Sequence, residues 1–503
     1  YLMILIGATR VSYRLIRLRR QNRTFPWSKR KKVMIIGGGE AGRSLITEIQ
    51  NSKYLDQKVV CIIDDDPYKI GRYIKGVKVV GNRNSIKKSV KKYNVQQIIL
   101  TIPSANAAKI RPIVEICQDT NCELMILPGV YQLVNGEVKA SKLRPVNIDD
   151  LLGRDEVHVN LNEVMDYVSG RVIMVTGGGG SIGSELCRQI AKHSPKQLII
   201  FDIYENNAYD IQQELLREQP KLDLVVLIGS VRDENRINSI FEQYRPEIIY
   251  HAAAHKHVPL MEGSPNEAIK NNVLGTYNMV RMADKWNAKR FVQISTDKAV
   301  NPTNIMGASK RICEMIIQTY NKESNTEYVA VRFGNVLGSN GSVIPLFKKQ
   351  IAEGGPVTVT HPEIIRYFMT IPEAVSLVLQ AGAYAKGGEI FVLDMGEPVK
   401  ILDLARNMIR LSGYKVDQDI KIEFTGLRPG EKLYEELLMD EEGMTDTPNK
   451  LIHIGHPIDV DEVKLAHALR VLESAAQNET DDMRLIVESI VPTYHPKLNK
   501  STQ

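Results

Sequence analysis

The chain has 503 residues, 43% of them hydrophobic and 25% charged, which allows about two to four globular domains. Its net charge of +6 is uneven, because residues 1–39 contain ten Lys or Arg and no Asp or Glu, and no later basic stripe interleaved with aromatic residues indicates a nucleic-acid partner. Five scattered cysteines suit a reducing compartment, exclude a disulfide framework and leave a metal site incomplete.

Residues 1–31 are predicted to be the end of a transmembrane helix followed by a basic juxtamembrane segment. The apolar run 1–8 is shorter than the roughly twenty residues that cross a bilayer, and five arginines follow it, as the positive-inside rule expects of a cytoplasmic exit. The apolar part precedes the charged part, unlike a signal peptide. We therefore expect a cytoplasmic (inner) membrane location through upstream helices, with the folded domains on the cytoplasmic side. An amphipathic surface helix is the alternative.

Residues 32–150 are predicted to form a first Rossmann-like domain, because strands and helices alternate along them. A strand at 32–36 runs into a glycine-rich turn, and the next strand ends at Asp64, where an acid can bind a ribose. Glu40 places a carboxylate beside the expected pyrophosphate, which is repulsive, so nucleotide binding here stays open. The glycines that fit the dinucleotide pattern are Gly37, Gly39 and Gly42.

A second and stronger dinucleotide pattern follows a linker at 151–170 and opens a domain at 171–455. The strand at 171–176 leads into a glycine-rich turn whose backbone N–H groups can approach a pyrophosphate at a helix N-terminus. The next strand ends at Asp202, which can bind ribose hydroxyls and would repel a 2′-phosphate, so NAD is favoured over NADP. The predicted cofactor-binding residues of the turn are Gly177, Gly180, Ser181, Ile182 and Gly183.

Small residues after another strand extend the predicted cofactor site. This strand closes at His251, and the short side chains that follow it let a flat ring lie against the backbone. His251, His255 and His257 lack the spacing of a helical metal-ligand pair, so solvated or cofactor-contacting histidines are expected and no metal site is predicted. The small residues are Ala252, Ala253 and Ala254.

The stretch 295–311 carries the strongest chemical signal. It follows a buried strand at 290–294, and Pro302 breaks the chain before a helix. Because ligands of open α/β sheets bind at the carboxyl ends of the strands, a hydroxyl, a carboxyl and an amine converge where chemistry would occur. A solvated turn with a surface ion pair is the alternative for so short a motif. The predicted catalytic residues are Thr296, Asp297, Lys298, Met306 and Lys310.

Together, the motifs at 176–183, 251–254, 295–298 and 306–310 resemble those of the extended short-chain dehydrogenase/reductases. More closely, nearly the whole chain is similar to membrane-anchored, CapD-like polysaccharide-biosynthesis proteins that act as UDP-N-acetylglucosamine 4,6-dehydratases. The resemblance implies an α/β fold with two Rossmann-like, doubly wound parallel-sheet domains, the second carrying a small substrate-binding lobe. Short-chain dehydrogenases have Tyr where this chain has Met306; the anchored dehydratases share the Met, and core packing is its alternative role.

The resemblance implies an NAD-dependent dehydration in which a 4-ketone acidifies C5, with the C5 configuration retained. Lys298 would be the C5 base and Asp297 the acid for the C6 hydroxyl, while Thr296 or Asp297 would take the O4 proton that a thioether cannot accept. A free lysine titrates near about 10.4, so the pKa of Lys298 would have to be lowered by burial or by nearby Lys310. Lys310 would also contact the nicotinamide ribose.

Substrate contacts are expected downstream of these motifs. The resemblance places an arginine fork for phosphate and a carboxylate for ribose over the UDP moiety, whereas the local sequence at 429–430 also fits a turn before a helix. Residues 456–503 are expected to form a helical extension and tail. The expected substrate-binding residues are Lys256, Asn335, Arg366, Arg428 and Glu431.

Two rival functions stay open at this point. A UDP-sugar 4-epimerase would share NAD and the fold but would need no acid–base pair for C5 and C6. A non-catalytic, membrane-linked nucleotide sensor would need no pair at all. Helices that flank this kind of sheet often pair between copies, which favours a homo-oligomer.

Overall fold

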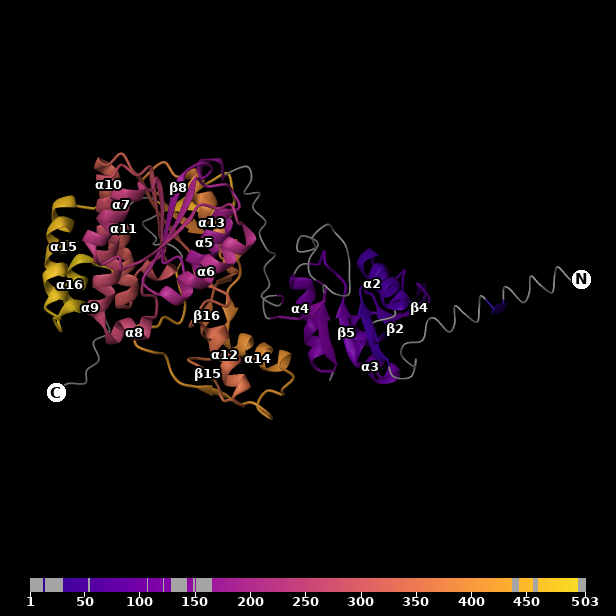
Figure 1. The fold of residues 1–503 in the computed structure, drawn as a ribbon. Helices are drawn as coiled ribbons and strands as arrows, with labels where there is room; N and C mark the ends of the chain where they lie inside the picture. Colours follow the sequence, from indigo (N-terminus) through magenta and orange to yellow (C-terminus); the bar gives the residue numbers. More distant parts are fainter. Residues whose placement is uncertain are drawn as a thin grey trace, which may run out of the picture. The chain divides into compact units, whose positions relative to one another are not determined.

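The chain forms two compact units (Figure 1). Unit 1 comprises residues 1–155 and 407–419, and unit 2 comprises residues 156–406 and 420–503. The computed structural model describes residues 12–13, 30–52, 55–105, 107–120, 122–127, 143–147, 150, 165–436, 443–455 and 460–495.

The structure contradicts the predicted membrane location. Among the described residues, no helix is both long enough and apolar enough to cross a bilayer. The expected end of a transmembrane helix, at 1–31, lies outside the described residues except for 12–13 and 30–31.

Unit 1 is built on a seven-stranded sheet of order β3-β4-β2-β1-β5-β6-β7. The strands from β4 to β6 run parallel, and a short antiparallel strand lies at each edge. Strands alternate with helices along the chain, which is the predicted Rossmann-like arrangement. The elements are β1 (Lys31–Ile36), α2 (Glu40–Asn51), β2 (Gln57–Ile63), β3 (Tyr73–Ile74), β4 (Val77–Gly81), η2 (Arg83–Ser85), α3 (Ile86–Tyr93), β5 (Gln97–Leu100), α4 (Ala107–Gln118), β6 (Glu123–Ile126) and β7 (Arg144–Pro145).

The glycine-rich turn of unit 1 is packed against the tip of β2. The Gly38 N–H donates to Asp64 Oδ2 at 2.7 Å, and Lys69 Nζ donates to the same oxygen at 3.1 Å. A Cβ atom at Gly42 would lie 2.1 Å from the carbonyl oxygen of Gly37, so this close approach requires glycine. The turn thus has a dinucleotide-type backbone, with the Asp64 carboxylate paired to a lysine. Nucleotide binding by unit 1 stays an open question.

Unit 2 contains a nine-stranded sheet of order β10-β9-β8-β11-β12-β13-β18-β22-β21. All neighbours from β10 to β18 are parallel, and β22 and β21 add antiparallel strands at one edge. The strand order reverses between β8 and β11, and ligands of such sheets bind at this switch point. The strands are β8 (Val172–Thr176), β9 (Gln197–Asp202), β10 (Leu224–Ile228), β11 (Ile248–His251), β12 (Arg290–Ile294), β13 (Glu327–Arg332), β18 (Ile390–Leu393), β21 (Met444–Asp446) and β22 (Ile452–Gly455).

Helices cover both faces of this sheet (Figure 1). The face carrying α7, α10 and α11 and the face carrying α5, α6 and α13 each bury a separate hydrophobic cluster against the strands. This doubly wound, three-layer arrangement confirms the predicted fold class. The helices are α5 (Ser181–Ala191), α6 (Glu205–Glu218), α7 (Glu234–Tyr244), α10 (Gly275–Lys285), α11 (Ile305–Glu323) and α13 (Ile371–Tyr384), with shorter η8 (Met165–Tyr167), α8 (Val258–Gly263), α9 (Pro265–Ala268), η9 (Ile269–Leu274) and η10 (Asp297–Ala299).

Two C-terminal helices, α15 (Glu462–Gln477) and α16 (Met483–Ile490), form an outer layer over α11 (Figure 1). Their buried Leu469, Leu472 and Met483 belong to the same hydrophobic cluster as the residues of α11. The predicted homo-oligomer gains no support from this face, because helices of the same chain occupy it.

The lobe that follows β13 consists of short strand pairs and small helices drawn in orange in Figure 1. Two of the pairs are parallel and one is antiparallel. The lobe elements are β14 (Asn335–Val336), α12 (Val343–Ala352), β15 (Val357–Val359), β16 (Ile365–Arg366), β17 (Phe368–Met369), β19 (Val399–Lys400), α14 (Ile401–Leu411) and β20 (Ile422–Phe424).

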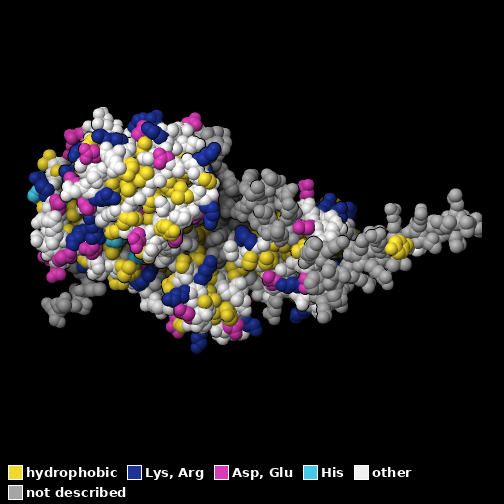
Figure 2. All heavy atoms as spheres, in the orientation of Figure 1, with side chains coloured by type: hydrophobic (Ala, Val, Ile, Leu, Met, Phe, Trp, Pro, Cys, Tyr) yellow, Lys and Arg dark blue, Asp and Glu magenta, His cyan; other side chains and the backbone are white. Residues whose placement is uncertain are grey.

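On the face visible in Figure 2, Lys and Arg side chains of unit 2 are interspersed with Asp and Glu. Hydrophobic side chains gather between them near the middle of this face. The visible face therefore presents no continuous basic stripe of the kind that follows a nucleic-acid backbone.

Candidate active site

A cavity of about 820 Å³ opens at the carboxyl end of the unit 2 sheet. Its walls come from the glycine-rich turn after β8, the loops after β11 and β12, the start of α11 and the lobe. Most of the predicted cofactor, catalytic and substrate-contacting residues therefore line one space, whereas Asp202, Ala253 and Asp297 do not. Of the predicted site residues, those lining the cavity are Gly177, Gly180, Ser181, Ile182, Gly183, Ala252, Ala254, Lys256, Thr296, Lys298, Met306, Lys310, Asn335, Arg366, Arg428 and Glu431.

The glycine-rich turn of unit 2 is packed so closely against its own backbone that side chains would not fit at its key positions. Gly177 has φ +65°, and a Cβ atom at Gly183 would lie 2.0 Å from the Gly177 carbonyl oxygen. Asp202 Oδ2 accepts a hydrogen bond from the Gly179 N–H at 2.8 Å, which fixes the acid beside the turn. Ala253 is packed against Gly177, because a Cβ atom added to Gly177 would lie 2.8 Å from the backbone nitrogen of Ala253. This tight cradle fits the pyrophosphate and ribose of a dinucleotide.

Replacing Gly183 by alanine should weaken NAD binding. The added methyl would meet the Gly177 carbonyl oxygen and displace the turn that approaches the pyrophosphate, so the affinity should fall about tenfold or more. Calorimetric titration with NAD measures the effect. Gly263→Ala is the matched control, since its Cβ atom would meet nothing within 4 Å. Equal affinities in both variants would contradict the assignment of this turn.

His251 differs from the solvated or cofactor-contacting histidine expected from the sequence. Its ring is fully buried, with Nδ1 2.6 Å from Thr176 Oγ1 and Nε2 3.1 Å from Thr276 Oγ1. Burial, assisted by the positive charge of Lys310, lowers the pKa of His251 to about 3. His251 is therefore a neutral core residue that joins β8 and β11 to α10.

Residues 295–303, called the catalytic segment because the predicted catalytic residues Thr296, Asp297 and Lys298 lie in it, begin where β12 ends. The segment presents its acid and its lysine as a pair. Thr296 Oγ1 donates to Asp297 Oδ1 at 2.9 Å, and Lys298 Nζ donates to the same oxygen at 2.9 Å. The Asp297 side chain is completely buried, and its Oδ2 has no hydrogen-bond partner among the described residues. Gly334 leaves space on this side, since a Cβ atom there would lie 3.1 Å from Oδ2. A proton can therefore move between Lys298 and Asp297 along one hydrogen bond.

The pKa of Lys298 is raised, whereas the sequence analysis expected it to be lowered. Burial alone would lower the pKa of Lys298, as predicted, but the carboxylates of Asp297 and Glu435 outweigh burial and raise it. The Arg366 guanidinium acts in the opposite direction and lowers the pKa. The expectation left out the adjacent Asp297 carboxylate, which raises the pKa more than Glu435 does, and also Glu435, whose Oε1 lies 3.7 Å from Lys298 Nζ and which comes from a segment remote in sequence. In the substrate-free protein Lys298 is a charged ammonium.

Helix α11 positions the other two predicted catalytic residues. Asn304 caps it, accepting the Gly307 N–H at 2.8 Å, so that Met306 and Lys310 lie on the side facing the cavity. Lys310 Nζ donates to the Ile294 carbonyl oxygen at 3.0 Å, and burial lowers its pKa. Met306 is 3% exposed and belongs to the hydrophobic core as well as to the cavity wall. Both suggested roles of Met306, core packing and site lining, are therefore present.

A buried ion cluster beneath the catalytic segment was missed from the sequence. Glu314 of α11 accepts hydrogen bonds from Ser295 Oγ at 2.7 Å and from Arg332 at 2.7 Å to each carboxylate oxygen. Arg311 adds a further bond at 2.9 Å. The spacing of Arg311 and Glu314 signals a helical pair, but no local signal connects them to Arg332 on β13. The cluster anchors Ser295, and thus the start of the catalytic segment, to α11.

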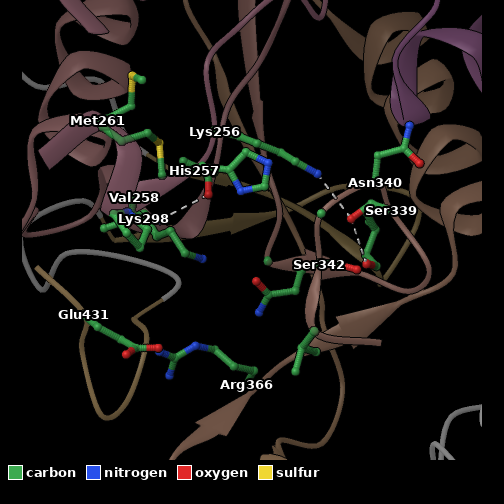
Figure 3. A pocket seen from close by; sticks show the side chains of 18 of the residues that line it. Lys256, His257, Val258, Met261, Lys298, Ser339, Asn340, Ser342, Arg366 and Glu431 are labelled. Carbon is green, nitrogen blue, oxygen red and sulfur yellow. Dashed lines mark hydrogen bonds and ion pairs between the residues drawn. The ribbon is translucent and has the colours of Figure 1, made fainter. Parts of the chain in front are cut away.

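The expected substrate-binding residues take different positions on the cavity wall (Figure 3). Lys256 points toward Ser339, with Nζ 3.4 Å from Oγ, and Arg366 and Glu431 point toward one another. Arg428 is paired with Glu431 at 3.0 Å and has an exposed side chain. Asn335 Nδ2 donates to a backbone carbonyl at 3.2 Å. The loop residues Ser339, Asn340 and Ser342 also line the wall and carry no recognisable sequence motif.

Arg366 does not present the free phosphate fork that the sequence suggested. Its Nη1 donates to the carbonyl oxygens of Ile365 and Leu433 at 2.7 and 3.2 Å, and its Nη2 donates to that of Lys432 at 2.7 Å. Glu431 and Glu435 lie 3.6 Å away. In this structure the guanidinium therefore holds the 431–435 segment, and Arg428 is the more accessible cation.

The fold and the site define an α/β protein of the extended short-chain dehydrogenase/reductase type. Residues 173–457 match the family described as polysaccharide biosynthesis protein, and the chain belongs to this family. Residues 1–128 match a CoA-binding domain.

Individual relatives agree with this assignment. The chain is 49% identical over 443 residues to the capsular polysaccharide biosynthesis protein CapD of Staphylococcus aureus, covering 88% of this chain and 73% of the relative. It is 36% identical over 279 residues to a UDP-glucose 4-epimerase of Rickettsia bellii, covering 54% of this chain and 79% of the relative. Among solved structures, Pen from Bacillus thuringiensis superimposes with a TM-score of 0.54 at 34% identity, covering 58% of this chain and 90% of that chain.

Proposed function

We propose that this protein is an NAD-dependent 4,6-dehydratase that converts UDP-N-acetylglucosamine to the UDP-4-keto-6-deoxy sugar. The observation that carries the proposal is the buried ion pair between Asp297 and Lys298. Lys298 lines the same cavity as the glycine-rich turn, and Asp297 lies directly behind it. Removing a proton from C5 and a hydroxyl from C6 requires such an acid and base side by side. A family role in polysaccharide biosynthesis agrees with a modified nucleotide sugar as product.

The residues present fit NAD, because the cradle at Gly177 and Gly183 excludes side chains and Asp202 stands beside it. When bound, NAD supplies the oxidant that takes hydride from C4 and later returns it to C6. Lys310, held by the Ile294 carbonyl, is assigned to the nicotinamide ribose side of the cavity. Met306 closes the wall without offering a proton acceptor.

In the proposed mechanism the catalytic pair moves two protons. Exclusion of water by the substrate favours a neutral amine, so Lys298 gives up its ammonium proton to solvent as the substrate enters. As C4 is oxidised, the O4 proton passes through the Thr296 hydroxyl to the Asp297 carboxylate, along the 2.9 Å hydrogen bond between these two side chains. Lys298 then removes the C5 proton, and Asp297 gives its proton to the departing C6 oxygen, so that the carboxylate is restored. Return of the C5 proton by the same amine would retain configuration.

A turnover assay tests the proposal directly. The purified protein with NAD and UDP-N-acetylglucosamine should yield a product lighter by one water in mass spectrometry. A product of unchanged mass with inverted C4 would identify a 4-epimerase, the rival that the Rickettsia relative favours. Nucleotide binding without turnover would favour the sensor. The buried ion pair between Asp297 and Lys298 argues against a sensor, because binding alone does not need an acid and a base.

A further inference from the structure

Residues 428–436, called the strap here, lie along the catalytic segment in the described part of unit 2. Lys432 Nζ donates to the Val300 carbonyl oxygen at 3.1 Å, and Asn301 Nδ2 donates to Glu436 Oε2 at 2.7 Å. Thr303 Oγ1 donates to the Gly430 carbonyl oxygen at 3.0 Å. A segment that follows the lobe is thereby fastened to the loop that carries the acid and the base.

Glu435 is the strap residue that reaches the catalytic lysine. Its side chain is 4% exposed, and its Oε1 lies 3.7 Å from Lys298 Nζ and 3.6 Å from Arg366 Nε. Burying a carboxylate is costly unless cations compensate it, and these two cations do so. The same residue lines the cavity, so its charge acts where the substrate sugar would lie.

The Lys298 ammonium consequently lies between two carboxylates from different parts of the fold. Asp297 holds it from the sheet side at 2.9 Å, and Glu435 holds it from the strap side. The Arg366 guanidinium, which is itself bound to the strap, opposes the two carboxylates and lowers the pKa of Lys298. A lysine side chain has four rotatable bonds and is otherwise free to swing within the cavity. A second carboxylate fixes where its nitrogen points (Figure 3 shows Lys298 in the cavity).

We propose that Glu435 is a positioning residue for the reaction: its carboxylate, presented by the strap, holds the Lys298 amine against Asp297 and toward the substrate. The role of Glu435 in the reaction rests on the proposed dehydratase function. The contact between Glu435 and Lys298 is independent of that function. Glu435 thereby joins the acid–base pair as a group that acts through Lys298 without touching the reacting atoms.

The experiment compares Glu435→Gln with Glu435→Asp. Loss of the carboxylate should lower the pKa of Lys298 by about one unit or more, because a facing negative charge favours the ammonium. ¹⁵N NMR titration of lysine Nζ in substrate-free protein, assigned with Lys298→Arg, measures this shift. In turnover, kcat of Glu435→Gln at its own pH optimum should fall about tenfold or more, with KM for UDP-N-acetylglucosamine nearly unchanged. Glu435→Asp should restore part of the Lys298 pKa and part of kcat.

Glu436→Gln is the matched control, because Glu436 lies on the same strap and bonds Asn301 and Lys432 instead of Lys298. Glu436→Gln should leave the pKa of Lys298 unchanged. An unshifted Lys298 titration in Glu435→Gln, or an equal shift in Glu436→Gln, would overturn the proposal. If the wild-type protein does not dehydrate the sugar while Glu435→Gln still shifts Lys298, the proposed function fails and the positioning contact stands.

Discussion

Replacing Lys298 by methionine is expected to stop the loss of water while the oxidation at C4 continues. The C5 proton then has no amine to take it, and general base catalysis of this kind contributes about 10²- to 10⁴-fold. The absorbance of the reduced cofactor should rise on addition of UDP-N-acetylglucosamine, and the mass of the sugar product should show no dehydration. In D₂O the wild-type protein should incorporate deuterium at C5, and the variant should not.

Lys298→Gln accompanies this variant, since methionine leaves the buried Asp297 carboxylate without its ion partner. Glutamine keeps an N–H donor for Asp297 and removes the base, so it should fold at least as well and remain unable to dehydrate. Dehydration at the wild-type rate in either variant would remove Lys298 from the role of C5 base.

The parts of the site that could be predicted from the sequence are those that local motifs and sheet topology determine. Thr296, Asp297 and Lys298 follow one strand directly, and the glycine-rich turn follows another. Because the carboxyl ends of parallel strands meet at one edge of the sheet, their convergence required no knowledge of side-chain packing. The structure brings both motifs to one cavity.

The parts that could not be predicted depend on contacts between remote segments. Glu435 reaches Lys298 from a segment remote in sequence, so its contribution to the raised pKa of Lys298 could not be predicted, whereas the larger contribution of the adjacent Asp297 could have been. Arg366 was assigned to phosphate from its charge, but backbone carbonyls of the strap occupy its Nη donors. Composition gives the charge of a side chain, whereas its free donors depend on which backbone atoms fold against it.

Replacing Glu314 by glutamine should cause a large loss of stability in unit 2. Glu314 is fully buried and accepts hydrogen bonds from Ser295, Arg311 and Arg332. Glutamine removes the carboxylate charge from the ion pairs that Arg311 and Arg332 make with Glu314, and breaking a buried ion pair in this way costs about 3–5 kcal/mol. Denaturant unfolding followed by the fluorescence of Trp286, in a Trp27→Phe background, reports on unit 2 because the chain has two tryptophans.

The pH dependence of the same measurement separates the charge from the packing. Burial by itself would raise the pKa of Glu314, but Arg332 and Arg311 outweigh it and lower the pKa from 4.5 to about 2. A lowered carboxyl pKa contributes stability above the unfolded value and loses it as the pH falls. The difference between wild type and Glu314→Gln should thus be greatest above about pH 5 and shrink toward pH 2. Glu353→Gln, which removes an exposed pair with Lys349, should change stability by less than about 1 kcal/mol at every pH. A Glu314→Gln loss that does not vary with pH would show that shape, and not charge, holds this cluster together.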